Sequence, residues 1–188
     1  MKQLTLVILL VISVVLCKAQ GNDLPPLDKS PMDMSYYPNN YPVLKIQDKA
    51  TEPVLARVIY SRPQKNGRII FGDLVEYGQV WRLGANEATE IEFYRDVKID
   101  GKKVAKGRYT LYAIPNQDSW TIILNKDVDT WGAFKYDAEK DVLRTTVPVQ
   151  KLNESVEALA ITFEKTENGC DLVFAWDNIK TSLPISLK

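Results

Sequence analysis

Residues 89–124, TEIEFYRDVKIDGKKVAKGRYTLYAIPNQDSWTIIL, decide the fold of this chain. At the start of the stretch, the apolar side chains of Ile91 and Phe93 alternate with the carboxylates of Glu90 and Glu92. Alternation with a period of two is typical of a β-strand that buries one face and exposes the other. The stretch therefore begins with a predicted strand whose glutamates form a solvated face.

Two turns divide the rest of the stretch into hairpins. Asp100-Gly101 separates residues 97–99 from 102–104, and these two residue types tolerate the positive φ of a two-residue hairpin turn. Pro115-Asn116-Gln117-Asp118 separates residues 107–114 from 120–124, and its composition also favours a turn. We therefore predict two consecutive antiparallel hairpins.

The same strand pattern continues on both sides of this stretch. Further strands are expected at residues 54–61, 143–149, 158–164, 170–176 and 181–185. Only short helical turns are expected, at residues 73–77 and 137–142, where Asp73 and Asp137 are suitable capping residues. Without helices to cover their apolar faces, about nine to ten short strands need a second sheet. The prediction is an all-β, single-domain antiparallel β-sandwich with minimal helix, of which a jelly roll is one form.

The composition excludes several classes of function. The chain has 188 residues, 24 basic and 24 acidic side chains and no histidine. A net charge of zero argues against a nucleic-acid partner held by phosphate neutralisation. The absence of histidine removes serine and cysteine triads and the usual zinc sites. No glycine motif of a nucleotide-binding loop is present, and Asp127 and Asp129 lack the rest of a calcium loop. We expect no metal and no cofactor.

The N-terminus predicts export. Residues 4–16 form an apolar run behind Lys2, and Cys17-Lys18-Ala19 supplies small residues for cleavage. Residues 1–19 are therefore interpreted as a signal peptide, and the run is too short for a helix that spans a membrane. The mature protein is expected in the periplasm, at the cell surface or outside the cell.

The cysteines leave a second interpretation open. Val14-Val15-Leu16-Cys17 resembles a bacterial lipoprotein signal in which Cys17 is acylated, although Leu16 departs from the small residue usual there. With Cys17 removed or acylated, Cys170 has no partner for a disulfide within the mature chain. Cys170 begins an apolar strand and is expected to be a buried core residue.

The mature chain divides into two parts. Residues 20–42 hold a cluster of prolines and are interpreted as a linker or strap, with Met32, Met34 and Tyr36 alternating like a short edge strand. Residues 43–188 form the predicted β-sandwich domain. We expect the strap to dock on this domain in part.

Residues 60–89 concentrate the candidate binding groups. Arg62 and Arg82 are planar donors suited to carboxylate, phosphate or sulfate, and Glu87 is placed to orient either one. Asn86 can both donate and accept a hydrogen bond. No acidic residue lies between Glu52 and Asp73, so this loop carries a local positive potential. Arginine–glutamate pairs also tie loops to sheets, and both interpretations stay open.

Two aromatic residues and one lysine extend this set. Trp81 and Trp131 lie in turn-like contexts, where an aromatic face can stack on a sugar ring or a cation. For Trp131 the alternative is a plug that covers the core. Lys126 is a further candidate for an anionic ligand.

The motifs of this chain resemble an uncharacterised family of exported bacterial proteins, domain of unknown function 2911. The resemblance is carried by residues 60–63 (YSRP), 67–68 and 70–72 (GR and IFG), 80–82 (VWR), 84–89 (GANEAT), 107–111 (GRYTL), 114–115 (IP), 120–123 (WTII) and 131–133 (WGA). It implies a compact β domain outside the cytoplasm and no established activity. The family's motif block falls on Arg62, Trp81, Arg82, Asn86, Glu87 and Thr89.

Three functions are consistent with these residues. We favour an envelope-associated binding module for a small anionic or sugar-like ligand over an enzyme. The first alternative is a glycan-active enzyme that uses Glu87 with Asp73 or Glu76 as acid and base. The second is a structural or protein-interaction domain in which the polar cluster only braces the fold.

Overall fold

The computed structural model describes residues 24–187 and contains nine strands. They are β1 (Met32–Tyr37), β2 (Ala56–Ser61), β3 (Glu90–Phe93), β4 (Val97–Ile99), β5 (Lys102–Val104), β6 (Gly107–Pro115), β7 (Ser119–Asn125), β8 (Asp141–Thr166) and β9 (Gly169–Ser186). One short helix, α2 (Tyr41–Ile46), and one 3-10 turn, η1 (Ala138–Lys140), complete the described elements. The predicted all-β fold is confirmed. The expected signal peptide, with Cys17, and the first residues of the strap lie outside the described residues.

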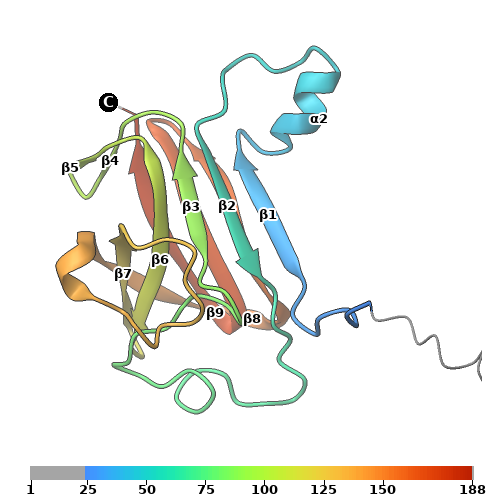
Figure 1. The fold of residues 1–188 in the computed structure, drawn as a ribbon, viewed down its shortest axis with the longest axis vertical. Coiled ribbons are helices and arrows are strands. Elements are labelled where there is room, and N and C mark those ends of the chain that lie inside the picture. The colour runs from blue at the N-terminus through green and yellow to red at the C-terminus, as the bar shows by residue number, and fades with distance from the viewer. Residues whose placement is uncertain (1–23, 188) are drawn as a thin grey trace, which may run out of the picture.

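The strands form one antiparallel sheet in the order β1-β2-β3-β6-β7-β8-β9-β4-β5. The first half of β8 pairs with β7, and its second half pairs with β9. The sheet therefore folds over along β8, and Figure 1 shows β8 and β9 behind β1, β2 and β3. The two layers enclose the core as in a sandwich.

The two longest strands differ from the expected pattern. Residues 143–149 and 158–164 were expected as separate strands, but both belong to β8, which is 26 residues long. Register shifts between Lys151 and Val156 and between Val156 and Ala160 mark irregular pairing in its middle. Such bulges bend a strand without ending it, so β8 can pass from one layer to the other. Residues 170–176 and 181–185 are joined in β9 in the same way.

Both predicted hairpins are present. Asp100 and Gly101 have φ values of 52° and 70°, and Ile99 pairs with Lys102 across the turn. The β6–β7 turn is closed by a hydrogen bond of 2.9 Å from Asn116 N to Ser119 O. Local turn chemistry was sufficient to locate these two hairpins.

The expected helical turns are only partly present. Asp137 caps η1, where its side chain accepts a hydrogen bond from Glu139 N. The turn expected at residues 73–77 is not helical, because Phe71 and Val75 form an isolated bridge there. Instead, the helix is α2, which contains a proline at its first turn as helix starts often do.

A cluster of large aromatic side chains fills one end of the core. Trp120 and Trp176 are each 1% exposed, as expected from their strand patterns. Phe71 and Trp81 pack against both of them, and the Trp81 and Trp176 rings lie 6.0 Å apart at an interplanar angle of 18°. Trp81 is thus part of the core, and the residue after it lies at the edge of the aromatic cluster.

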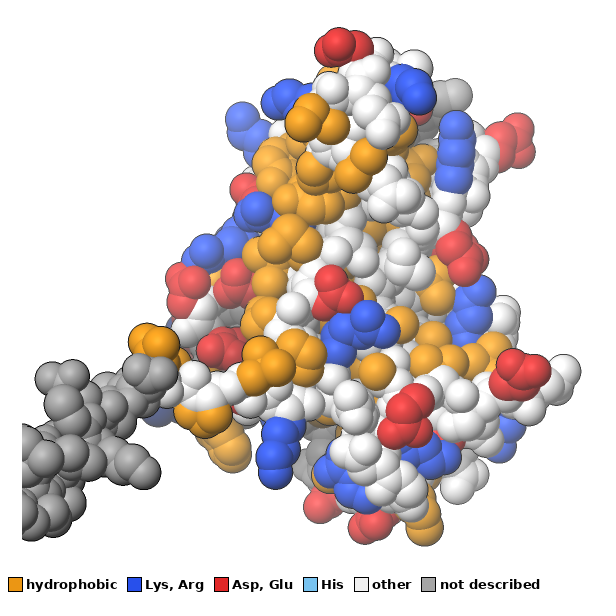
Figure 2. Space-filling model, turned by 90° about the vertical axis from the view of Figure 1, so that its right-hand side faces the viewer, with side chains coloured by type: hydrophobic (Ala, Val, Ile, Leu, Met, Phe, Trp, Pro, Cys, Tyr) orange, Lys and Arg blue, Asp and Glu red, His pale blue; other side chains and the backbone are white. Residues whose placement is uncertain are grey.

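Side chains of β1 and of the residues just after it contact the second half of β8. Ser35 Oγ donates to Ile161 O at 2.7 Å, and Asn39 Nδ2 donates to Phe163 O at 2.8 Å. β1 lies within residues 20–42 and is the edge strand next to β2. Figure 2 shows this side of the molecule, where hydrophobic side chains form a band between charged groups. The seam between β1 and β8 therefore closes one side of the sandwich without backbone pairing.

Candidate functional site

The loop at residues 62–89 connects β2 to β3 and runs below the sandwich in Figure 1. Trp81 anchors it, because its backbone exchanges hydrogen bonds of 2.7 and 2.9 Å with Ala113 of β6. The Trp81 ring is buried and its Nε1 donates to Gly84 O at 3.3 Å. A core residue therefore holds the middle of the loop in a fixed position.

Arg82 follows this anchor, and its side chain is half-buried. Its Nε atom is buried and has no hydrogen-bond partner. Among residues 24–187, no carboxylate forms an ion pair with the Arg82 guanidinium. Burial lowers the pKa of this guanidinium from its ordinary value, and no nearby acidic group opposes the shift. Arg82 thus carries a partly desolvated and uncompensated positive charge.

A cavity of about 170 Å³ lies at Arg82. Its polar side chains are Ser30, Arg68 and Arg82, and its apolar walls include Pro63, Leu74, Val75, Trp81 and Trp176. No carboxylate of the described chain lines it. Arg68 is held beside it by bonds from Nε to Lys65 O and from Nη2 to Gln64 O. The cavity therefore combines positive charge with hydrocarbon walls.

Arg62 lies elsewhere, in the seam between β1 and β8. Its Nε donates to Leu159 O at 3.0 Å, and its Nη1 lies 3.1 Å from Asp33 Oδ2. Both charged side chains of this pair are more than a third exposed. The guanidinium of Arg62 is committed to partners on two strands, which is a bracing arrangement.

Asn86 and Thr89 shape the loop. Asn86 adopts a left-handed conformation with φ of 57°, and its carbonyl accepts a hydrogen bond from Gly132 N at 2.9 Å. Thr89 is fully buried, and its Oγ1 donates to Leu83 O at 2.8 Å. Neither residue lines the cavity at Arg82.

Glu87 and Trp131 lie beside a different hollow. They are opposite each other in an isolated bridge, and both side chains are exposed, Trp131 by 62%. Glu87 lines a hollow of about 250 Å³ with Glu90 and Asp129, where Arg108 pairs with both of the latter carboxylates. Glu87 therefore does not orient either arginine.

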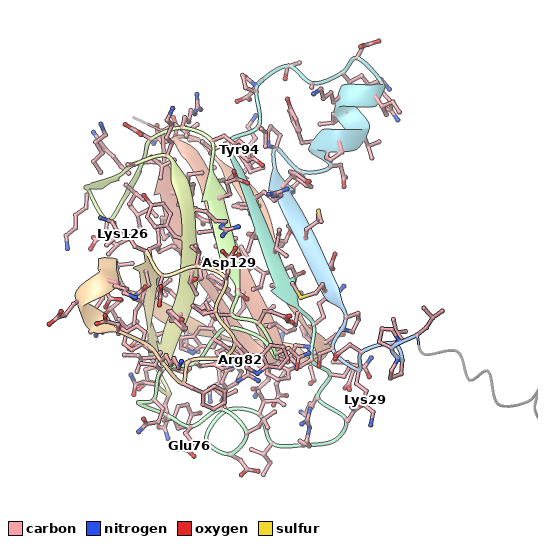
Figure 3. The ribbon with its side chains drawn as sticks, in the orientation of Figure 1. Lys29, Glu76, Arg82, Tyr94, Lys126 and Asp129 are labelled. Atoms are coloured by element: carbon pink, nitrogen blue, oxygen red, sulfur yellow. The ribbon has the colours of Figure 1, made fainter. Side chains whose placement is uncertain are left out.

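The remaining charged candidates are also separate from Arg82. Figure 3 shows Arg82 near the lower ends of β3 and β6, with Lys126 and Asp129 higher in the view and Glu76 below. Lys126 is exposed, and neither Asp73 nor Glu76 lines the hollow that contains Glu87. The sequence candidates therefore do not form one site: Arg82 lines the cavity, Arg62 lies in the seam between β1 and β8, and Glu87 lines the solvent-facing hollow.

Most residues of the cavity were not among the sequence candidates. Two of them come from distant parts of the chain: Ser30 lies in the strap, and Trp176 belongs to β9. Their positions beside Arg82 depend on long-range packing, so no local sequence signal identified them. Arg68 lies in the segment between Glu52 and Asp73 that has no acidic residue, and it was not a candidate.

No metal-binding cluster of three or more His, Cys, Asp or Glu side chains occurs within residues 24–187. In the same part of the chain, no helix is long and apolar enough to cross a membrane.

Comparison with known proteins identifies the family. The family model described as "Protein of unknown function (DUF2911)" matches residues 44–185. The chain belongs to the DUF2911 family. The resemblance inferred from the motifs is therefore confirmed, and the match includes Arg62, Arg68 and Arg82 and extends from α2 into β9. No curated protein and no solved structure matches the chain significantly.

Proposed function

We propose that this DUF2911 protein binds a small anion in the cavity at Arg82. The observation that carries the proposal is the half-buried guanidinium of Arg82, which has no carboxylate partner among residues 24–187 and a buried Nε without an acceptor. Leaving a buried donor without a partner typically costs about 1–3 kcal/mol. An anion in the cavity would give the Arg82 guanidinium the counter-charge that it lacks within the described chain.

The surroundings favour an anion over a neutral sugar. Arg68 adds a second positive charge, and no described carboxylate lines the cavity. A sugar needs several polar groups that both donate and accept, whereas the Arg68 and Arg82 side chains of this cavity can only donate. The positive charge of the two arginines and the absence of a carboxylate from the described lining therefore support an anionic ligand.

Titration calorimetry and thermal shift with acetate, sulfate and phosphate, against chloride at equal ionic strength, test this proposal. At least one of these anions is expected to bind and to raise the melting temperature. Arg82→Gln should abolish that effect, because it removes the charge and the planar donor fork. Arg62→Gln is the matched control: it removes an arginine of the same loop that is already paired with Asp33, and should leave anion binding intact.

Two results would contradict the proposal. One is a parent protein that no tested inorganic anion or carboxylate stabilises beyond chloride. The other is an Arg82→Gln variant that binds the anion as well as the parent does.

We also propose that the protein acts outside the cytoplasm. The support is the sequence of residues 1–19, with its apolar run and cleavage residues. Mass spectrometry of the mature N-terminus in cells tests this: cleavage after Ala19 supports plain secretion, and an acylated Cys17 supports a lipid anchor. An intact Met1 would contradict export through this segment.

A further inference from the structure

The walls of the Arg82 cavity restrict the anion further. We infer that the ligand is an organic monocarboxylate with a short apolar body, and this inference rests on the anion-binding function proposed above. Three properties of the cavity carry it: its hydrocarbon walls, its single unpartnered buried donor and its size.

Several polar groups of the walls are already hydrogen-bonded. The two tryptophans have already committed their indole N–H groups, Trp81 to Gly84 O and Trp176 to Glu157 O. The carbonyl of Ala85 accepts a hydrogen bond from Ser61 Oγ at 2.6 Å. About half of the surface that faces the cavity is hydrocarbon, which favours a ligand with an apolar body behind its charged group.

Charge balance favours one carboxylate over a dianion. Arg82 supplies one half-buried guanidinium, and Arg68 is exposed and held by two backbone carbonyls. A planar carboxylate can accept two parallel hydrogen bonds from one guanidinium fork, and a single negative charge is neutralised by it. The second charge of a dianion would have to rely on Arg68, whose guanidinium is exposed and already donates to two carbonyls, so it would be compensated less well.

The volume limits the length of the ligand. A cavity of 170 Å³ corresponds to about five or six water molecules at roughly 30 Å³ each. A carboxylate with a body of three or four carbons has a similar number of heavy atoms. Butyrate is therefore a suitable probe, acetate leaves the apolar end empty, and the end of octanoate would extend into solvent because the cavity is partly open.

Calorimetric titration of the purified protein with acetate, butyrate, octanoate, malonate and phosphate at constant ionic strength tests this inference. Each buried methylene should tighten binding about fourfold, so butyrate should bind on the order of fifteenfold tighter than acetate. Malonate and phosphate should bind more weakly than butyrate, and octanoate should gain nothing over it.

A wall variant provides the matched control. Leu74 lines the cavity and is 47% exposed, so Leu74→Asn should fold normally. It should reduce the preference for butyrate over acetate, because it replaces part of the apolar wall with a polar side chain.

The outcomes separate the two proposals. Equal affinity for acetate and butyrate would contradict the inference that the ligand is a monocarboxylate with an apolar body. Phosphate binding that is tighter than butyrate binding and is abolished by Arg82→Gln would also contradict it. Both results would still support an anion site at Arg82. If none of these anions binds, both proposals fail. Both proposals are supported if butyrate binds more tightly than acetate, if Arg82→Gln abolishes this binding and if Leu74→Asn reduces the preference.

Discussion

Arg62 Nη1 lies 3.1 Å from Asp33 Oδ2, and this ion pair joins the loop after β2 to edge strand β1. The second arginine of the motif block, Arg82, has no such partner among the described residues. The same loop therefore contains one arginine that braces the fold and one that is available to a ligand. The two residues should respond to substitution in opposite ways.

Arg62→Ala should lower the free energy of unfolding by about 1–3 kcal/mol, because it leaves the carbonyl of fully buried Leu159 without its side-chain donor. Urea denaturation measures the change. Asp33→Asn is the control that weakens only the exposed ion pair, and it should cost less than about 1 kcal/mol. Equal effects of both variants would mean that the bond to Leu159 contributes nothing.

Arg82→Met should leave the melting temperature unchanged or raise it. Methionine keeps an apolar chain against the tryptophans and removes the unpartnered Nε, and replacing such a buried polar group is often neutral or stabilising. Differential scanning calorimetry without added anions makes the comparison. A marked fall in the melting temperature would instead assign Arg82 to bracing.

Tyr136 should make stability sensitive to alkaline pH. Burial and the hydrogen bond to Asp141 raise the pKa of its hydroxyl from 10.0 to about 12. A raised pKa means that the folded state holds the proton more tightly than the unfolded state does. The stabilisation by the Tyr136 hydroxyl is therefore complete below about pH 10 and is lost as pH rises toward 12. The stability difference between the parent and Tyr136→Phe should therefore shrink over this range in urea titrations.

Tyr77→Phe is the control for that measurement, since the Tyr77 hydroxyl makes no hydrogen bond with the rest of residues 24–187. Its stability should follow that of the parent at each pH. A constant offset between the parent and Tyr136→Phe from pH 9 to 12 would exclude the proposed linkage.

Cys170 should be chemically inert in the folded protein. It is 0% exposed, and burial raises the pKa of its thiol to about 12, so the reactive thiolate is scarce at neutral pH. In a Cys17→Ser background, a maleimide reagent should label the protein in denaturant and not in buffer. Rapid labelling of the folded protein would show that β9 opens locally.

Gly169→Ala should destabilise the turn between β8 and β9 by about 1–3 kcal/mol, the usual cost of inserting a methyl group into packed structure. A Cβ at this position would lie 2.1 Å from Ile185 O, which is a backbone atom and cannot move aside independently. Gly101→Ala is the steric control, because a Cβ there meets nothing within 4 Å, although its φ of 70° adds some strain. Thermal denaturation of both variants compares the two effects.

Features set by neighbouring residues were predictable from the sequence. The Asp100-Gly101 turn and the Asp137 cap depend on a few adjacent residues, and both are present. The alternation of Met32, Met34 and Tyr36 likewise matches edge strand β1.

Features that need distant parts of the chain were not predictable. Arg62 and Asp33 meet because β1 pairs with β2, and Ser30 reaches the Arg82 cavity along the same strap. The middle of β8 is polar and mostly exposed, so its continuity as one strand has no apolar alternation to signal it. Between Arg82 and Asn86, Leu83 has φ of 55°, a left-handed conformation uncommon for leucine. The positions of Arg62 and Arg82 in the sequence therefore could not show which of the two would have no carboxylate partner among the described residues.

The most direct test of the central claim follows Arg82 itself. Nuclear magnetic resonance can observe the Nε–H proton of Arg82, assigned by its loss in Arg82→Gln, during titration with butyrate at constant ionic strength. We predict that this resonance shifts in step with binding, as the Arg82 guanidinium gains a carboxylate partner. A resonance that stays unchanged while butyrate saturates the protein would contradict the claim that Arg82 forms the anion site.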